Sequence, residues 1–214
     1  MSSSVSATLQ RATALHSQGQ LGEAEKLYRA ILAQVPDHFD AMHLLGVIAL
    51  QTGHAQAAVE LIGKATAINR KHPAAHLHIG HALLELHRDD EALASFERAL
   101  KLKPDYAEAL SNRGKVLFFL GRADEALACY ERALKLAPGT HELFNNQGSA
   151  LQFLKRPEEA VASYRRALAL QPEYAEALSN YGNALSTLKR YDEALVALDR
   201  AIALKPDFHQ ALFN

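Results

Sequence analysis

The sequence predicts an all-α fold, an α-solenoid built from helix-turn-helix repeats. The heptapeptide YAEALSN occurs twice, at residues 106–112 and 174–180, an offset of 68 residues. Sliding the chain by half of that offset, 34 residues, brings glycines, prolines and alanines into register along its length. A fixed period of roughly 20–50 residues is typical of solenoids and arrays, in which each unit buries its apolar face against its neighbours.

The residues that recur define the register. Glycine recurs at Gly46, Gly80, Gly114, Gly148 and Gly182. Proline recurs at Pro36, Pro104, Pro138, Pro172 and Pro206. Alanine recurs at Ala24, Ala58, Ala92, Ala126, Ala160 and Ala194, and again at Ala65, Ala99, Ala133, Ala167 and Ala201. The predicted parts are a disordered tail at 1–4, six units at 5–38, 39–72, 73–106, 107–140, 141–174 and 175–208, and the start of a truncated seventh unit at 209–214.

Each unit is predicted to be a helical hairpin. In the unit that starts at residue 175, Leu178, Tyr181 and Leu185 have helical spacing, which is typical of one helix face. The run Lys189-Arg190-Tyr191 then interrupts the pattern before a second apolar series begins. The recurring glycine and alanines lie where two helices must approach closely, because a larger side chain there would separate them.

Two units depart from this register. The first unit has Ala12 in place of the glycine and Ile31 in place of the second alanine, as expected for a degenerate N-terminal cap. The second unit has Arg70 in place of the proline. We therefore expect its second helix to continue toward Pro73, since nothing earlier in the unit ends it.

The composition excludes several classes of partner. With 23 basic and 24 acidic residues the net charge is −1, whereas a nucleic-acid or anionic-membrane surface needs a basic excess. No apolar run approaches the roughly 18 residues of a membrane span, and the N-terminal residues lack a secretory signal pattern. The single cysteine, Cys129, allows no internal disulfide and is compatible with a reducing compartment. We therefore predict a cytoplasmic location.

The fourth unit shows the repeating pattern most completely. Its pattern consists of Leu110, Gly114, Leu117, Ala126, Tyr130, Ala133 and Pro138. This pattern resembles the tetratricopeptide repeat family over nearly the whole chain, although the family's tryptophan is absent throughout. The resemblance implies a right-handed superhelix whose first helices line a concave groove. It also implies a protein-protein interaction scaffold that binds a peptide segment of a partner in that groove.

The sixth residue of successive units is an asparagine toward the C-terminus. These residues are Asn112, Asn146, Asn180 and Asn214. Because an amide offers both a donor and an acceptor, such a ladder matches the two groups that each peptide unit of a bound chain repeats. The ladder resembles the repeat region of O-GlcNAc transferase, where an array of asparagines binds the backbone of the substrate. The alternative is that these amides bond only within the groove.

Further side chains are expected to face the same groove. Lys115 and Asn183 are the ninth residues of their units. Phe118, Phe119 and Phe153 occupy the twelfth and thirteenth positions and form an aromatic cluster. Exposed apolar clusters often mark partner sites, so one interpretation is a pocket for a partner. The alternative is that the rings pack against the neighbouring hairpin.

A metal site has one candidate. His78, His81 and Glu85 fall at i, i+3 and i+7, which is one helical face, and could supply three ligands, with His43 one unit earlier. The alternative is a set of groove-lining or surface side chains, because the spacing matches no established ligand signature. We predict no metal and no cofactor. No catalytic motif is recognisable, so we predict no enzymatic activity for this segment.

The groove does not resemble the carboxylate clamp of chaperone-binding family members. That clamp needs lysines or arginines, whereas the second residues of three units are Glu108, Glu142 and Glu176. Acidic side chains there would repel a C-terminal carboxylate. We therefore exclude the C-terminal tails of chaperones as ligands.

The last six residues open another first helix without a capping helix. We expect the chain to be a fragment of a longer protein, and its uncapped end to allow self-association. Two functions stay open. One is an adaptor scaffold, and the other is the substrate-recruiting N-terminal region of a larger enzyme, in particular an O-GlcNAc-transferase-like glycosyltransferase.

Overall fold

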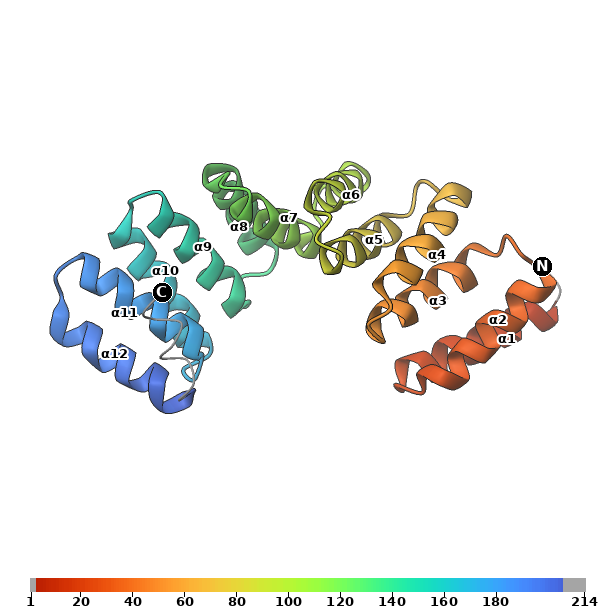
Figure 1. Ribbon diagram of the computed structural model, residues 1–214, viewed down its shortest axis with the longest axis horizontal. Coiled ribbons are helices and arrows are strands. Elements are labelled where there is room, and N and C mark those ends of the chain that lie inside the picture. Colours follow the sequence, from red (N-terminus) through yellow and green to blue (C-terminus); the bar gives the residue numbers. More distant parts are fainter. Residues whose placement is uncertain (1–2, 206–214) are drawn as a thin grey trace. The chain divides into compact units, whose positions relative to one another are not determined.

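The computed structural model describes residues 3–205, and this part of the chain contains twelve helices and no strand. The helices are α1 (Ser3–Ser17), α2 (Leu21–Gln34), α3 (Phe39–Gln51), α4 (Ala55–Ile68), α5 (Pro73–Glu85), α6 (Asp89–Leu102), α7 (Ala107–Phe119), α8 (Ala123–Leu136), α9 (His141–Phe153), α10 (Pro157–Leu170), α11 (Ala175–Thr187) and α12 (Tyr191–Leu204). Each odd-numbered helix and the helix that follows it form an antiparallel hairpin (Figure 1).

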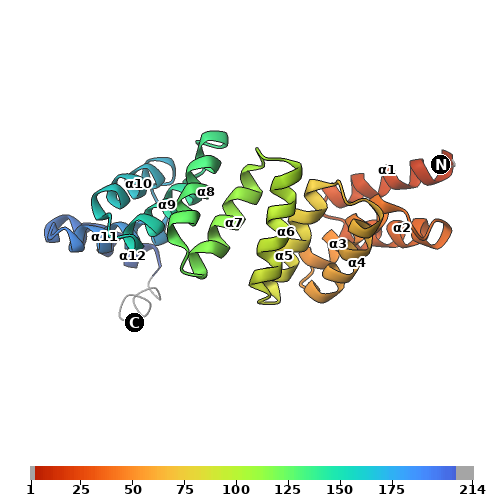
Figure 2. The ribbon, with the colours of Figure 1, turned by 90° about the horizontal axis from the view of Figure 1, so that it is seen from above.

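The hairpins are grouped into two compact units. The N-terminal unit contains α1–α6 and ends at Pro104, and the C-terminal unit contains α7–α12 and begins at Asp105. Within each unit the second helix of one hairpin packs against the first helix of the next, as α4 does on α5 and α10 on α11 (Figure 2). This arrangement confirms the predicted all-α fold of stacked helical hairpins.

A left-handed residue ends every first helix. The residue with positive φ lies at the same register position in all six hairpins described between residues 3 and 205, namely Gly19, Gly53, His87, Gly121, Lys155 and Lys189. The next residue donates its backbone N–H to the carbonyl five residues earlier, over 2.7–3.0 Å, as from Arg190 to Leu185. This bond satisfies a terminal carbonyl and reverses the chain. The predicted break at Lys189-Arg190-Tyr191 is therefore a specific helix-ending motif.

In five of the hairpins described, from α3–α4 to α11–α12, a glycine of the first helix faces a large side chain of the second. A Cβ added to Gly80 would lie 2.5 Å from the ring of Phe96, and one added to Gly114 would lie 2.6 Å from Tyr130. Real Cβ contacts are longer than this, so the two helices can approach so closely only with glycine in this position. The same close approach occurs at Gly46, Gly148 and Gly182.

Four second helices begin with the same ion pair. The arginine before the first helical residue donates two hydrogen bonds of 2.6–2.8 Å to a glutamate three residues later. The pairs are Arg88–Glu91, Arg122–Glu125, Arg156–Glu159 and Arg190–Glu193. The hydrogen bonds from each arginine hold the pKa of its glutamate below the usual value. A carboxylate in the first turn also interacts favourably with the helix dipole.

The expected extension of the second unit's helix is wrong. Helix α4 ends at Ile68, and Asn69 follows as its C-cap. The side chain of Asn69 accepts a hydrogen bond of 3.1 Å from the backbone N–H of Lys71, which turns the chain. In addition, the residue before Pro73 is disfavoured in the helical conformation. A proline at position 70 is therefore not needed to end this helix.

Two predictions concern the ends of the chain. Helix α1 begins at Ser3, inside the expected tail, whereas the expected seventh unit at 209–214 lies outside the described residues. The division into six units stays a prediction. None of the helices described between residues 3 and 205 is both long and apolar enough to span a membrane.

The close approach inside the hairpins is tested by adding one methyl group. Gly80→Ala should destabilise the protein by about 1–2 kcal/mol, since overpacking outweighs the better helix propensity of alanine. The matched control is Gly63→Ala, because a Cβ there would meet only the Cδ1 atom of Ile79, at 3.9 Å. The control should be stabilised by about 0.5–1 kcal/mol. Urea unfolding measures both, and equal effects of the two substitutions would contradict the packing argument.

Candidate functional site

The asparagine positions fall at equivalent places in three successive first helices. Asn112, Asn146 and Asn180 are the sixth residues of α7, α9 and α11, and each is half-buried. The fourth member of the predicted ladder, Asn214, lies outside the described residues. We call the surface that carries the three described asparagines the asparagine face.

Asn180 is part of a hydrogen-bond network between two hairpins. Its Nδ2 donates to Asn145 Oδ1 over 3.1 Å. Asn145 in turn donates to Glu176 Oε1 over 3.0 Å and to the hydroxyl of Tyr174 over 3.4 Å. Burial, followed by the charges of Glu176 and Glu142, raises the pKa of Tyr174 to about 12. The network joins α9 to the start of α11.

Asn145 was missed as a polar anchor by sequence analysis. Its side chain is 0% exposed, and an amide buried so completely would be costly without partners. The sequence did contain a sign of this role at the fifth position of the unit, where other units have apolar or small residues such as Leu77 and Ser179. An asparagine among them indicates a buried amide that needs partners from the next hairpin.

The other two asparagines have different surroundings. Asn112 Nδ2 donates to the carbonyl of Glu108 within its own helix, over 2.9 Å. The Nδ2 atom of Asn146 is buried and has no hydrogen-bond acceptor within residues 3–205. The three positions are therefore equivalent in register but differ in bonding, and the hydrogen bond of Asn180 to Asn145 joins neighbouring hairpins.

The aromatic candidates come together on α7 and α9. The ring centroids of Phe118 and Phe119 are 6.3 Å apart, and those of Phe118 and Phe153 are 5.9 Å apart. Phe119 is 82% exposed and Phe153 is 58% exposed. The ninth residues of two units, Lys115 and Asn183, are both exposed.

The candidate metal ligands are not arranged as a metal site. Across the described residues 3–205, no group of three or more His, Cys, Asp or Glu side chains could hold a metal ion. The rings of His78 and His81 are 6.4 Å apart between centroids, and Glu85 is exposed. Instead, His78 Nδ1 shares a hydrogen bond of 2.9 Å with Nε2 of His43, one hairpin earlier.

His43 lies at the centre of an aromatic cluster in the N-terminal unit. Its ring stacks on Phe39 and on His78 at centroid distances of 5.6 and 5.1 Å, and meets His72 edge to face at 5.2 Å. The residue is 5% exposed. Burial first, and then the positive charges that His78 and His72 can carry, lower the pKa of His43 to about 3. It is thus a neutral imidazole that joins α3 to α5.

Comparison with known proteins identifies the repeats. A family model described as tetratricopeptide repeat matches residues 72–139, 105–173 and 139–207, and a second model with the same description matches residues 15–77. One curated relative, Protein O-mannosyl-transferase TMTC1 from Mus musculus, is 34% identical over 100 residues. That stretch covers 45% of this chain but 11% of the relative, so the chain spans a small part of it.

Solved structures share the fold. YrrB, a TPR protein with an unusual peptide-binding site, has a TM-score of 0.74 at 22% identity, and the match covers 87% of this chain and 96% of YrrB. MamA from Desulfovibrio magneticus RS-1, residues 41 to the end, has a TM-score of 0.72 at 21% identity, covering 86% and 96%. At these identities the likeness is one of fold.

The buried imidazole predicts how stability depends on pH. Folded His43 stays neutral down to about pH 3, whereas in the unfolded chain it takes up a proton near pH 6.5, so acid favours unfolding between these values. Between about pH 7.5 and pH 5 this residue should contribute a loss of about 2 kcal/mol. Leucine is the equivalent residue of the next unit, Leu77. The His43→Leu variant should therefore lack this share of the loss of stability, about 2 kcal/mol, between these pH values. Equal losses in urea unfolding of both proteins would contradict this assignment.

Proposed function

The chain belongs to the tetratricopeptide repeat family, and from this premise we propose that it is a scaffold that binds an extended peptide segment of a partner protein along its asparagine face. The observation that carries the proposal is the asparagine at the same position of α7, α9 and α11. The peptide-binding site of YrrB, a protein of the same fold, supports binding of this kind.

Amides in this arrangement can bind a backbone with little regard to sequence. Packed helices lie about 8–10 Å apart, and an extended chain advances about 3.3 Å per residue, so one asparagine meets about every third peptide unit. The half-buried amides of Asn112 and Asn146 lie in one unit, on α7 and α9. Asn146 Nδ2 is buried and the described chain offers it no acceptor, so turning this side chain outward to donate to a ligand carbonyl breaks no hydrogen bond of that atom.

The aromatic cluster supplies apolar contact next to these amides. Phe119 and Phe153 expose most of their rings on the same two helices. A partner side chain that covers them removes apolar surface from water, which is the main source of affinity at such sites. The exposed Glu108, Glu142 and Glu176 favour a neutral or basic segment and disfavour a C-terminal carboxylate.

Binding is tested with a peptide selected on the native protein from a random library. Asn112→Ala with Asn146→Ala should weaken binding about tenfold or more, since two net hydrogen bonds contribute about 1 kcal/mol each. Asn180 is left intact because it bonds to Asn145. The control is Gln171→Ala, an exposed amide after α10. Unchanged affinity in a double variant with an unchanged melting temperature would remove the ladder from the proposal.

The aromatic contribution is tested separately with the same peptide. Phe119→Ser with Phe153→Ser should lower the affinity about tenfold while changing stability by only about 0.5 kcal/mol per site, because both rings are exposed. Leu195→Ser on α12 is the control, since it removes another exposed apolar side chain, 60% accessible. If the control weakens binding as much as the phenylalanine pair does, the cluster is not a specific pocket.

A second candidate function is substrate recruitment within a larger glycosyltransferase. The identity shared with Protein O-mannosyl-transferase TMTC1 over 100 residues is the observation that favours it. The repeats themselves are a scaffold, so this function needs a catalytic region elsewhere in the protein, and the full coding sequence would decide between the two. The cytoplasmic location and self-association through the C-terminal end stay predictions.

A further inference from the structure

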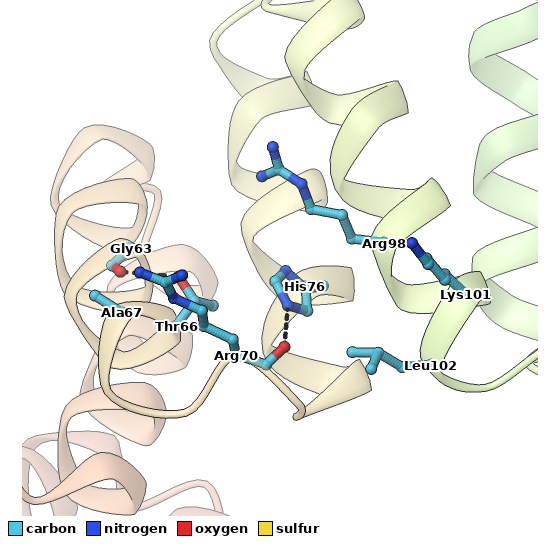
Figure 3. A pocket seen from close by; sticks show the side chains of 8 residues that line it. All are labelled: Gly63, Thr66, Ala67, Arg70, His76, Arg98, Lys101 and Leu102. Carbon is cyan, nitrogen blue, oxygen red and sulfur yellow. Dashed lines mark hydrogen bonds between the residues drawn. The ribbon is translucent and has the colours of Figure 1, made fainter.

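The N-terminal unit contains a basic cavity that is separate from the asparagine face. It has a volume of about 480 Å³ and lies between α4, α5 and α6 (Figure 3). Arg70 approaches it from the turn after α4, His76 from α5, and Arg98 and Lys101 from α6. Its lining includes three cationic side chains and no acidic one.

The cavity exists because one helix position lacks a side chain. Gly63 occupies a register position at which other units carry long or charged residues, namely Arg29, Glu97, Glu131, Arg165 and Asp199. Packing does not require glycine here, because an added Cβ would meet nothing closer than 3.9 Å. Glycine also lowers helix stability relative to other residues. Its effect is to leave open the space that a long side chain would fill.

Two more departures from the register shape the same cavity. Arg70 replaces the proline of the other units, and His76 replaces a large apolar residue, which is Met42 in the preceding unit and Leu110 in the following one. His76 is 8% exposed, and its Nε2 donates to the carbonyl of Arg70 over 2.9 Å (Figure 3). The buried imidazole therefore fixes the turn from which Arg70 projects.

The cations of this cavity lack a paired carboxylate among residues 3–205. Within the described chain, no carboxylate forms an ion pair with Arg70, Arg98 or Lys101, whereas each arginine at the start of α6, α8, α10 and α12 pairs with a glutamate. Arg70, Arg98 and Lys101 are all exposed, so an anion from solvent can reach them, and cations that line one cavity attract an anion.

We propose that this cavity binds a phosphomonoester group. A phosphomonoester carries about −1.5 to −2 charges at neutral pH and three strong acceptor oxygens, which matches three cations better than a single carboxylate does. Arginine binds such a group through paired hydrogen bonds, and lysine binds it as a point charge. The group belongs either to a phosphorylated side chain of a protein or to a small organic phosphate. The site does not depend on the proposed peptide binding.

Isothermal titration calorimetry at near-physiological salt tests the proposal on the intact chain. One arm uses a short phosphoserine peptide and its unphosphorylated form, and the other uses glycerol phosphate. Binding of the phosphoserine peptide alone supports the proposal and assigns a phosphoprotein, and binding of glycerol phosphate alone supports it and assigns a small organic phosphate. Binding of both supports the shared chemistry. Equal binding of the two peptides, or no binding of either phosphate, overturns it.

Variants locate the site. Gly63→Glu introduces the residue of Glu97 and Glu131 into the cavity, and Arg98→Ala with Lys101→Ala removes two cations. Each should weaken phosphate binding at least tenfold with an unchanged helical circular dichroism spectrum. The matched control is Arg132→Ala with Lys135→Ala, because these residues hold the same register positions in α8 and change the net charge equally. The control should stay within twofold, and an equal loss in the control overturns the site.

Discussion

The close approach of the two helices in each hairpin is the constraint on which the rest of the structure depends. Five of the first helices place a glycine against a large side chain of the second helix, and in three hairpins that side chain is a buried aromatic ring. The contact fixes how far apart the helices lie and how one is rotated about the other. Within each unit, equivalent register positions then lie at equivalent places on successive hairpins.

The repeated hairpins place asparagines at equivalent positions, but these asparagines differ in their hydrogen-bond partners. The amides of Asn112, Asn146 and Asn180 share a register position, yet Asn180 bonds to Asn145 and thereby to the preceding hairpin. A buried amide network stabilises a stack only when each member has its partners. The C-terminal hairpin therefore uses this register position for contact with its neighbour, whereas Asn112 donates within its own helix.

The six hairpins described between residues 3 and 205 pack in the same way, so their sequences can be compared position by position. Where most hairpins agree, the residue serves the shared fold, as the glycines opposite Phe96 and Tyr130 do. Where the residue of one hairpin differs from its equivalents in the others and the shared packing does not require it, that residue makes a feature specific to its own hairpin. Gly63 and Arg70 differ from their equivalents and line one cavity. His43 and His78 also differ, and their hydrogen bond joins α3 to α5.

The 34-residue period by itself determined the helical hairpins, the small residues between them and the register of the asparagine positions, because periodic burial leaves a direct trace in residue type. Contacts across hairpins were decided only by the tertiary structure. Register places Asn180 on a helix face, but the rotation of its amide toward Asn145 depends on neighbours 35 residues away. The end of α4 depended on the Asn69 turn, and His78 pairs with His43 rather than forming a metal site. Spacing along one helix does not specify these partners, since hydrogen bonds and charges act between atoms that only the packed hairpins bring together.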